Sequence, residues 1–432
     1  MLAGLFWIVS AVAAGLCLYR LAVEKDLFGL GTYLLFGVYV PLFLSFCDWS
    51  SYHVQERNQW FYYLFIVFGL AVVIFLILPQ GRMGMTNIRF VRRPGAVPVE
   101  VYNLIFAGCV LLENWYLSGR FFPSLAGIDI HTQRMPYIYF LTTGVYLVAV
   151  LDLLEFHITR RPRFLAYLLG AVVLNVVSKS ARVDAFLCIL QIMSLWMFLV
   201  FSRRDRVRKR KPRRLGFLLV VALAAVGAIR YALDTGNHRM NHFGQYTYTY
   251  AEGIGYHGPQ WLGEVLPYYY GYFALSFDNL AHNLEHVAGD LALWGPNTFR
   301  ALWFGLFQFD NLFGLNGSAA PRANEIRCAA AAVTTGFWDL YYDYGLLLVI
   351  PVAVSFFIYM ILRRRVTGHL VRTRDLVVYF YWVPLWFLMS FDNRVYDYQV
   401  IWHLLILYLV VGRRYTMYYD QHPKMEQKGK TP

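Results

Sequence analysis

The chain has 432 residues, of which 58% are hydrophobic and only 15% are charged. A soluble core of this size could not bury so much apolar surface, so the composition excludes an ordinary soluble enzyme and favours an integral membrane protein. The formal net charge is +13, but the lysines and arginines fall mainly in short runs between apolar stretches. That pattern is typical of membrane topology signals rather than of nucleic-acid binding.

Apolar stretches long enough to cross a bilayer recur along the chain. A spanning helix needs about 20 residues, with about 17 to 25 tolerated, and the sequence predicts about eleven such helices in a single integral membrane domain, residues 1–432. The predicted spans are Leu2–Ala22, Phe28–Phe46, Trp60–Leu78, Val99–Leu117, Pro136–Ile158, Phe164–Val177, Phe186–Phe201, Leu215–Ala232, Leu340–Leu362, Leu376–Ser390 and Tyr398–Val411. The predicted fold class is therefore an all-α polytopic membrane protein.

The loops between these spans alternate in charge. Basic runs follow the third, fifth, seventh, ninth and eleventh spans, whereas the even-numbered exits carry few positive charges for their length. Because basic loops stay in the cytoplasm, we expect the N-terminus outside and the tail, residues 412–432, inside. The polar turns at 178–184 and 392–397 then both face outward, and they bring Arg182 and Arg394 to the same side.

The longest connection, residues 233–339, is expected to be one large periplasmic loop, since a segment this long without a span indicates a functional or separately folded unit. Between Leu266 and Val287 the apolar residues recur at intervals of three and four, which predicts an amphipathic helix that lies at the interface or caps a cavity. A second such helix, or a re-entrant segment, is expected at Arg300–Leu315. The polar face of the first helix carries Asp278, His282, Glu285 and His286.

Charged residues on the outer side are the candidates for chemistry, because an ionisable group in or near a membrane is costly without a partner. Arg182 stands at the tip of a short hairpin between two apolar helices. His238, Arg239 and His242 lie within five positions of one another, which suits proton transfer beside a bound phosphate and equally suits an interfacial polar turn. His282 and His286 lack the Glu-x-x-His frame of a zinc protease, so no metal site is predicted.

Signatures of several soluble enzyme classes are missing from the sequence. It has no GxxxxGK phosphate loop, no Gly-x-Ser-x-Gly elbow and no Cys-x-x-Cys pair. ATP-driven work is therefore not expected. The first outer loop also lacks the paired acidic residues of a metal-dependent lipid-linked glycosyltransferase, so neither a metal nor a cofactor is predicted.

Three segments carry a resemblance to a known family. They are the Ser/Arg turn at Ser178–Ala185, the aromatic segment Tyr268–Asn283 (YYYGYFALSFDNLAHN), and the approach from Asn324 through Thr334-Thr335-Gly336 to the helix start that contains Asp339, Asp343 and Gly345. With them, and in its overall architecture, the chain resembles the Wzy-type O-antigen and oligosaccharide repeat-unit polymerases of bacterial inner membranes. The resemblance implies a GT-C-like membrane glycosyltransferase fold.

The resemblance also implies a reaction. A glycan on undecaprenyl pyrophosphate is transferred to another lipid-linked repeat unit at the periplasmic face, and undecaprenyl pyrophosphate leaves. Arginine suits a pyrophosphate leaving group because its guanidinium never deprotonates and donates two hydrogen bonds at once. The residues assigned to pyrophosphate are Arg182, Arg239, Arg327 and Arg394; those assigned to catalysis are Arg182, His242 and Asp343; those assigned to substrate binding are His238, Tyr270, Tyr272 and Asp339.

The partners implied are the undecaprenyl-pyrophosphate-linked oligosaccharide and membrane lipid, with no nucleic acid, and a chain-length regulator is left open. The aromatic segment either stacks on sugar faces or simply packs at the interface. A lipid-linked glycan ligase of the same fold, which differs only in its acceptor, is the nearest alternative function. A polysaccharide or lipid transporter should show internal repeats and helices broken near the bilayer midplane, and an assembly protein should tolerate loss of the outer arginines.

Overall fold

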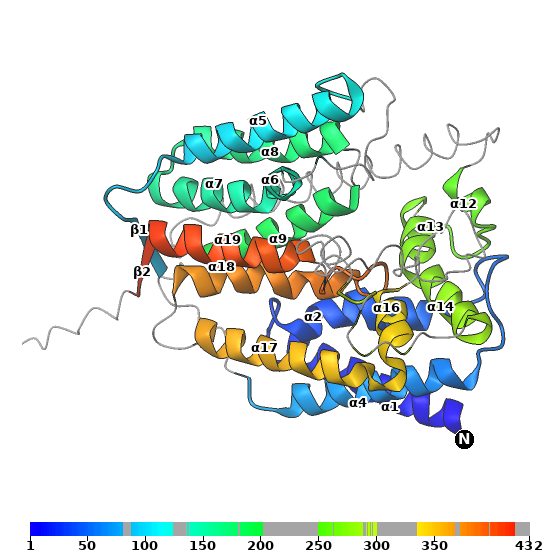
Figure 1. Cartoon of the computed structure of the whole chain (residues 1–432). Helices are drawn as coiled ribbons and strands as arrows, with labels where there is room; N and C mark the ends of the chain where they lie inside the picture. The colour runs from blue at the N-terminus through cyan, green and yellow to red at the C-terminus, as the bar shows by residue number, and fades with distance from the viewer. Residues whose placement is uncertain are drawn as a thin grey trace, which may run out of the picture. The chain divides into compact units, whose positions relative to one another are not determined.

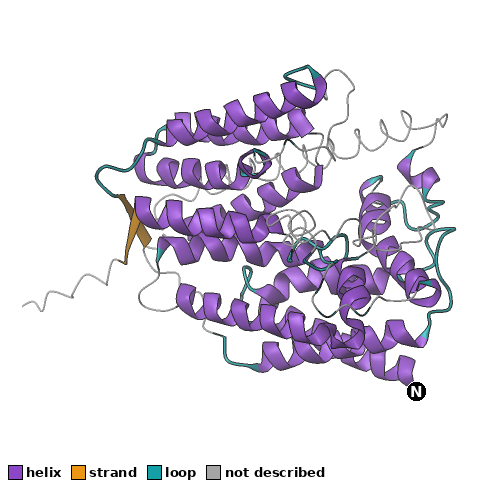
Figure 2. Cartoon of the chain, viewed as in Figure 1, coloured by secondary structure: helices purple, strands orange, loops and turns teal. Residues whose placement is uncertain are grey.

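The computed structural model describes residues 1–80, 88–123, 135, 138–179, 182–201, 249–261, 263–287, 291, 293, 295, 297–299, 335–367, 372–396 and 398–419. It is mostly helical (Figure 1 and Figure 2). The chain divides into two compact units. Unit 1 consists of Met1–Gln80, Val221–Arg363 and Tyr381–Trp402, and unit 2 of Gly81–Val220, Arg364–Phe380 and His403–Pro432.

Within the described residues, three helical segments are long and apolar enough to cross a membrane: Leu2–Ala22, Gln59–Ile77 and Gly336–Thr367. Shorter apolar helices lie at Leu30–Leu44, Pro162–Ser178 and Phe186–Val200. A helix satisfies its own backbone hydrogen bonds, which is why apolar helices are the form that a chain takes in lipid. The structure thus supports the predicted helical membrane protein class.

In unit 1, helices α1 (Leu2–Ala22) and α4 (Gln59–Ile77) pack along each other (Figure 1). The Asn58 side chain caps α4 by accepting a hydrogen bond from the Phe61 N–H, at 3.1 Å. Gly69 permits the close approach of α1, because a Cβ at that position would lie 2.7 Å from Val9 Cγ1. Small residues at such crossings let two apolar helices come together in lipid.

The predicted span Phe28–Phe46 forms three consecutive helical segments instead of one regular α-helix. These are α2 (Leu30–Leu34), the π-helical turn η1 (Leu35–Tyr39) and α3 (Val40–Leu44). The π turn brings Gly37 against the backbone of Phe387, which lies in the 3₁₀ segment η7 (Val383–Leu388). A π turn inside an α-helix widens it locally, and apolar composition carries no signal for it.

The aromatic segment forms a helix where the sequence predicts one, in three pieces. They are α13 (Val265–Tyr269), the π turn η3 (Tyr270–Ala274) and α14 (Leu275–His286), and the short helix α12 (Tyr250–Gly253) precedes them. The residues of its predicted polar face differ in burial. Asp278 is buried there because it pairs with Arg57, whereas Glu285 and His286 are exposed.

The C-terminal helices follow the predicted spans closely. They are α16 (Gly336–Tyr344), the 3₁₀ segment η6 (Gly345–Leu348), α17 (Val349–Thr367), α18 (Thr373–Trp382) with η7, and α19 (Tyr398–Arg414). Gly345, at φ +54°, ends α16 in a conformation that other residues rarely adopt.

Unit 2 is built around α7 (Val145–Thr159), which is buried along almost its whole length. Helices α5 (Val99–Ser118), α8 (Pro162–Lys179) and α9 (Arg182–Phe201) pack on it (Figure 1), and the one-turn helix α6 (Tyr139–Thr142) precedes it. Helix α8 ends at Lys179 and α9 begins at Arg182, so the stretch predicted to turn back on itself does form two helices.

Unit 2 also contains a small antiparallel sheet that the sequence analysis did not predict. Strand β1 (Ile88–Arg92) pairs with β2 (Tyr415–Tyr419) in the register Ile88 to Tyr419 and Arg92 to Tyr415 (Figure 2). The pairing joins a loop to the beginning of the tail, more than 300 positions later in the sequence. The sequence does not reveal it, because strands of five residues are too short to show a clear alternation of apolar and polar side chains. The predicted span Leu215–Ala232 and helix Arg300–Leu315 lie outside the described residues, as do large parts of the loop at 233–339.

The approach of η1 to η7 predicts a sensitive position at Gly37. An ideal Cβ there would lie 2.7 Å from the Phe387 carbonyl carbon and closer still to two other backbone atoms of the same residue. We expect Gly37→Ala to lower the stability of the protein by about 1 to 3 kcal/mol, because backbone cannot move aside as a flexible side chain does. Thermal unfolding of the purified protein in detergent measures the effect.

Gly15→Ala is the matched control, since nothing lies within 4 Å of a Cβ at Gly15 in α1. Alanine is the better helix former by about 1 kcal/mol, so this control should match or exceed the wild-type unfolding temperature. Equal unfolding temperatures for Gly37→Ala and the wild type would show that η1 and η7 are not in the contact described.

Candidate functional site

Two of the predicted site residues, Asp339 and Asp343, lie on one short helix of unit 1, α16. Both side chains are buried. The Asp343 carboxylate accepts hydrogen bonds from the Asn297 backbone N–H at 3.0 Å, from Asn297 Nδ2 at 2.8 Å and from the Thr298 backbone N–H at 2.5 Å. A carboxylate with several such donors is held in a fixed orientation. Asp343 therefore anchors the 297–299 segment to α16.

A second chain segment, the turn at 389–396, meets α16 at its N-terminus. The Gly336 N–H donates to the Met389 carbonyl at 2.9 Å, and a Cβ at Gly336 would lie 3.0 Å from Asn393 Cα. Asn393 Nδ2 in turn donates to the Thr298 carbonyl at 3.2 Å. The absence of a side chain at Gly336 thus lets the start of α16 approach the Asp-Asn-Arg turn, although the two are far apart in the sequence.

We refer to Thr298, Thr335, Asp339, Asp343, Ser390 and Asn393 as the α16 polar cluster. Thr298 connects its parts, because its hydroxyl donates to the Asp339 carbonyl at 3.2 Å. Arg394 lies at its edge, with Nε 2.9 Å from Asp392 Oδ2 in an ion pair whose angle is not that of a hydrogen bond. The side chain of Arg394 is about a quarter exposed.

Three residues of the α16 polar cluster with uncharged side chains each have a buried oxygen without a hydrogen-bond partner among the described residues. These oxygens are Thr335 Oγ1, Ser390 Oγ and Asn393 Oδ1. Buried polar atoms in native proteins are almost always paired, so unpaired ones call for a water or a ligand. Hydroxyl and amide groups beside carboxylates are the groups that hydrogen-bond the hydroxyls of a sugar.

A second polar group in unit 1 joins the loop between α3 and α4, which is the first outer loop of the sequence analysis, to α14. Arg57 Nη2 lies 2.9 Å from Asp278 Oδ1 and 2.6 Å from the Ser45 carbonyl oxygen, and the Val54 N–H donates to the same Asp278 oxygen at 3.1 Å. His53 Nδ1 lies 3.4 Å from that oxygen. The side chains of Arg57 and Asp278 are 1% and 2% exposed, so this ion pair is removed from water.

Aromatic rings enclose the guanidinium of Arg57. Its Cζ lies 4.2 Å from the Phe46 ring centroid and 4.5 Å from that of Phe61. Burial lowers the pKa of the Arg57 guanidinium, and Asp278 opposes the shift. The two ring faces and the Asp278 carboxylate together offset part of the free-energy cost of removing the Arg57 cation from water.

The aromatic residues predicted to bind substrate pack against other aromatic side chains. Tyr270 is fully buried and its hydroxyl donates to the Cys47 carbonyl at 2.8 Å. Tyr272 stacks on Tyr250, with centroids 5.3 Å apart, and contacts Phe391 at 5.5 Å. Tyr270 thus occupies the place of a packing residue, whereas Tyr272 is half-buried and keeps part of its surface accessible.

The remaining predicted residues are not brought into this arrangement by the described structure. Arg182 is the first residue of α9 in unit 2, and its side chain is not among the described ones. Four others lie outside the described residues, and their roles stay predictions: His238, Arg239, His242 and Arg327. Within the described part of the chain, no group of three or more His, Cys, Asp or Glu side chains is placed to hold a metal ion.

Arg57 and His53 were missed by the sequence analysis. In the first outer loop, the sequence analysis considers only acidic residues and not Arg57. An arginine in a loop that the charge pattern places outside runs against the positive-inside rule, and that departure is the one signal in the sequence that could have drawn attention to it.

Breaking the Arg57 and Asp278 pair should be costly. Asp278→Ala leaves a buried guanidinium without its carboxylate, so we expect a loss of about 3 to 5 kcal/mol in stability. The double variant Arg57→Met, Asp278→Leu removes both charges and should recover most of that loss, because hydrophobic replacements of a buried pair are often neutral. Thermal unfolding of the wild type, Asp278→Ala and the double variant provides the measurement, and a double variant as unstable as Asp278→Ala would contradict the pairing.

Asp343 provides a separate test of the α16 polar cluster. Asp343→Ala leaves the Asn297 and Thr298 donors without an acceptor, at about 1 to 3 kcal/mol for each buried donor left unpaired. Asp343→Asn retains one acceptor oxygen and should lie between the alanine variant and the wild type in unfolding temperature. Identical unfolding temperatures for all three proteins would mean that the carboxylate does not anchor the 297–299 segment.

The chain was also compared with known proteins. No protein-family model matches it, and no curated protein and no solved structure matches it significantly. A functional assignment for this chain therefore has to be argued from its own residues.

Proposed function

We propose that the protein is a metal-independent membrane glycosyltransferase that polymerises undecaprenyl-pyrophosphate-linked oligosaccharide repeat units, as in the synthesis of O-antigen, lipopolysaccharide, capsule or a related polysaccharide. The observation that carries this proposal is the contact between Gly336 and Asn393. It unites two of the sequence features that the proposal depends on, the Thr-Thr-Gly helix start and the outer turn that holds Arg394.

The proposed topology has eleven spans in a bacterial inner membrane, the N-terminus outside and the active site facing the periplasm. The charge alternation of the loops supports this orientation. In it, residues 233–339 form the periplasmic loop and residues 412–432 the cytoplasmic tail. The helices that are long and apolar enough to cross a membrane are compatible with this scheme.

The reaction as proposed breaks the bond between the anomeric carbon of the donor glycan and its pyrophosphate oxygen. A hydroxyl of the acceptor repeat unit forms the new glycosidic bond and gives up its proton to a base. Negative charge develops on the leaving pyrophosphate, which arginines stabilise where they lie close to it. Arg182, Arg239, Arg327 and Arg394 are proposed for that role.

The proton acceptor is proposed among the histidines His238 and His242, with Asp343 as the carboxylate alternative. The oxygens of Asp343 already accept hydrogen bonds from Asn297 and Thr298, so His242 is proposed first as the base. Asp339 and the unpaired oxygens of Thr335, Ser390 and Asn393 suit the binding of sugar hydroxyls. Tyr272 is the aromatic residue best placed to stack on a sugar, since it is half-buried.

Arg182→Ala is expected to abolish glycan chain extension while the protein still inserts into the membrane in normal amounts. The reason is the loss of a cation beside the leaving pyrophosphate. Complementation of a polymerase-deficient strain, followed by electrophoresis of its polysaccharide, measures chain length. Arg120→Ala is the control, because Arg120 is exposed and follows the fourth predicted span on the same outer side. Wild-type chain lengths in the Arg182→Ala strain would refute the role given to Arg182.

Incubation of the purified protein with lipid-linked repeat units tests the reaction itself. A ladder of lipid-linked products should form without ATP and without added metal ion. The ligase alternative predicts no ladder, and instead transfer of the glycan to a different acceptor once that acceptor is added. Product analysis therefore separates the two functions.

A further inference from the structure

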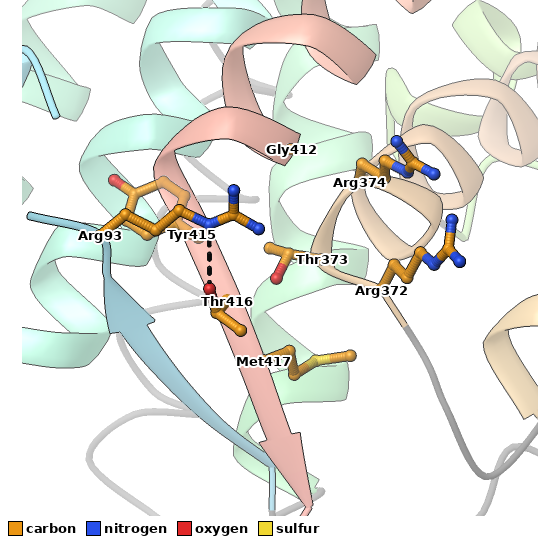
Figure 3. A pocket seen from close by; sticks show the side chains of 8 residues that line it. All are labelled: Arg93, Arg372, Thr373, Arg374, Gly412, Tyr415, Thr416 and Met417. Atoms are coloured by element: carbon orange, nitrogen blue, oxygen red, sulfur yellow. Dashed lines mark hydrogen bonds between the residues drawn. The ribbon is translucent and has the colours of Figure 1, made fainter.

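Unit 2 contains a polar pocket that the proposed function does not use. Its volume is about 260 Å³. Strands β1 and β2 lie on one side of it and the beginning of α18 on the other (Figure 3). The residues that line it are Arg93, Arg372, Thr373, Arg374, Gly412, Tyr415, Thr416 and Met417.

The fold brings these residues together from three places in the sequence. The Arg93 N–H donates to the Arg414 carbonyl at 2.9 Å, which extends the pairing of β1 with β2, and Arg93 Nε donates to Thr416 Oγ1 at 3.0 Å (Figure 3). Gly412 in α19 leaves room for Arg374, since a Cβ there would lie 3.1 Å from Arg374 Cδ. Each of the three segments follows an odd-numbered predicted span, so the charge pattern assigns all of them to the cytoplasmic side.

The three arginines of the pocket have no carboxylate partner among the described residues. The nearby acids are already engaged: Asp375 lies 3.7 Å from Arg365, and Glu155 lies 2.7 Å from Arg414. The Arg374 guanidinium stacks on the Tyr408 ring, 4.1 Å from its centroid, and its buried Nε has no hydrogen-bond partner. Stacking on a ring fixes the plane of the guanidinium and leaves its N–H groups to an acceptor in that plane.

Thr373 provides an independent indication of a ligand. Its side chain faces the pocket (Figure 3) and the residue is only 3% exposed, yet its Oγ1 has no hydrogen-bond partner. Thr373 is also the first residue of the ten-residue helix α18, and the dipole of a helix favours an anion at this end. The Asp375 and Leu376 N–H groups already donate to the Arg372 carbonyl, so only the N–H groups before them can serve a ligand. A buried hydroxyl, a helix N-terminus and three arginines without a described carboxylate partner thus line the same pocket.

We propose that this pocket binds a phosphate group. Phosphate has the acceptor oxygens and the negative charge that guanidinium groups, a threonine hydroxyl and a helix N-terminus recognise together. The ligand is a phosphate of the cytoplasmic side, either the headgroup of an acidic phospholipid in the facing leaflet or a soluble phosphate. The site is separate from the chemistry proposed at the periplasmic face and does not depend on it.

Binding of inorganic phosphate to the purified full-length protein in detergent tests the chemistry. We expect phosphate to raise the unfolding temperature of the wild type in a saturable way, whereas equal ionic strength of chloride should not. Arg372→Gln should weaken binding about tenfold or more, since a hydrogen bond between charged groups contributes at least about 1.5 kcal/mol and each 1.4 kcal/mol is tenfold. Arg372 is exposed, so the substitution leaves the fold intact.

Arg413→Gln is the matched control, because Arg413 is an exposed arginine beside Gly412 that does not line the pocket. Its phosphate affinity should stay within about twofold of the wild type, as expected for a surface charge outside the site. Thr373→Val, which removes only the hydroxyl, should also weaken binding. Equal losses in Arg372→Gln and Arg413→Gln would show a general charge effect and overturn the proposal, as would no saturable phosphate effect.

A vesicle experiment distinguishes the source of the phosphate. The protein is reconstituted in phosphatidylcholine alone or with phosphatidylglycerol, and bound phosphatidylglycerol is measured by native mass spectrometry. Retention of this lipid by the wild type and the Arg413→Gln variant, but not by Arg372→Gln, assigns the site to a lipid headgroup. Saturable binding of inorganic phosphate without such retention assigns it to a soluble phosphate, and the absence of both effects refutes the site.

Discussion

A charge enclosed by apolar helices has to be paired, and the described structure meets this constraint in both units. In unit 1, Arg57 pairs with Asp278 and Arg363 pairs with Asp26, each across more than 200 positions of sequence. In unit 2, Arg414 pairs with Glu155 at 2.7 Å. Breaking such a pair leaves an uncompensated charge, at about 3 to 5 kcal/mol, whereas replacing both partners by apolar residues is often neutral. The pairs therefore contribute less to total stability than to the choice of which segments lie together.

This constraint accounts for the place of the α16 polar cluster. Arg57 holds α14 through Asp278, and α14 reaches the 389–396 turn through the Ser276 hydroxyl, which donates to the Ser390 carbonyl. The same turn accepts the N-terminus of α16. Helix α14 thus connects the buried ion pair of Arg57 and Asp278 to the turn that carries Ser390 and Asn393, two of the residues with unpaired oxygens. The positions of those oxygens depend on a contact that lies outside the cluster itself.

The sequence predicts the bounds of some of the described helices closely, because the length of an apolar run is a local property that the bilayer fixes. Helices α1, α4 and α5 lie within a residue of the predicted bounds. What could not be predicted depends on contacts between distant segments. The π turn at Gly37 is set by its approach to Phe387, and the strands β1 and β2 gain their hydrogen bonds only from each other. The burial of Asp278 depends on its pairing with Arg57, which the spacing of polar residues along one helix cannot show.

For the site, the sequence analysis names candidate residues but not the contacts that each one makes. Asp343 is predicted from the sequence to be catalytic, and in the described structure its oxygens accept hydrogen bonds from Asn297 and Thr298. These donors hold the carboxylate in one orientation, which no sequence pattern indicates. The arginines also differ in their contacts. Arg57 forms an ion pair with Asp278, whereas Arg93, Arg372 and Arg374 have no carboxylate partner among the described residues. Net charge alone cannot separate these two populations, because only the fold decides which cations find an acid within reach. An unneutralised cation beside an unpaired buried hydroxyl marks the place where a ligand supplies the missing charge.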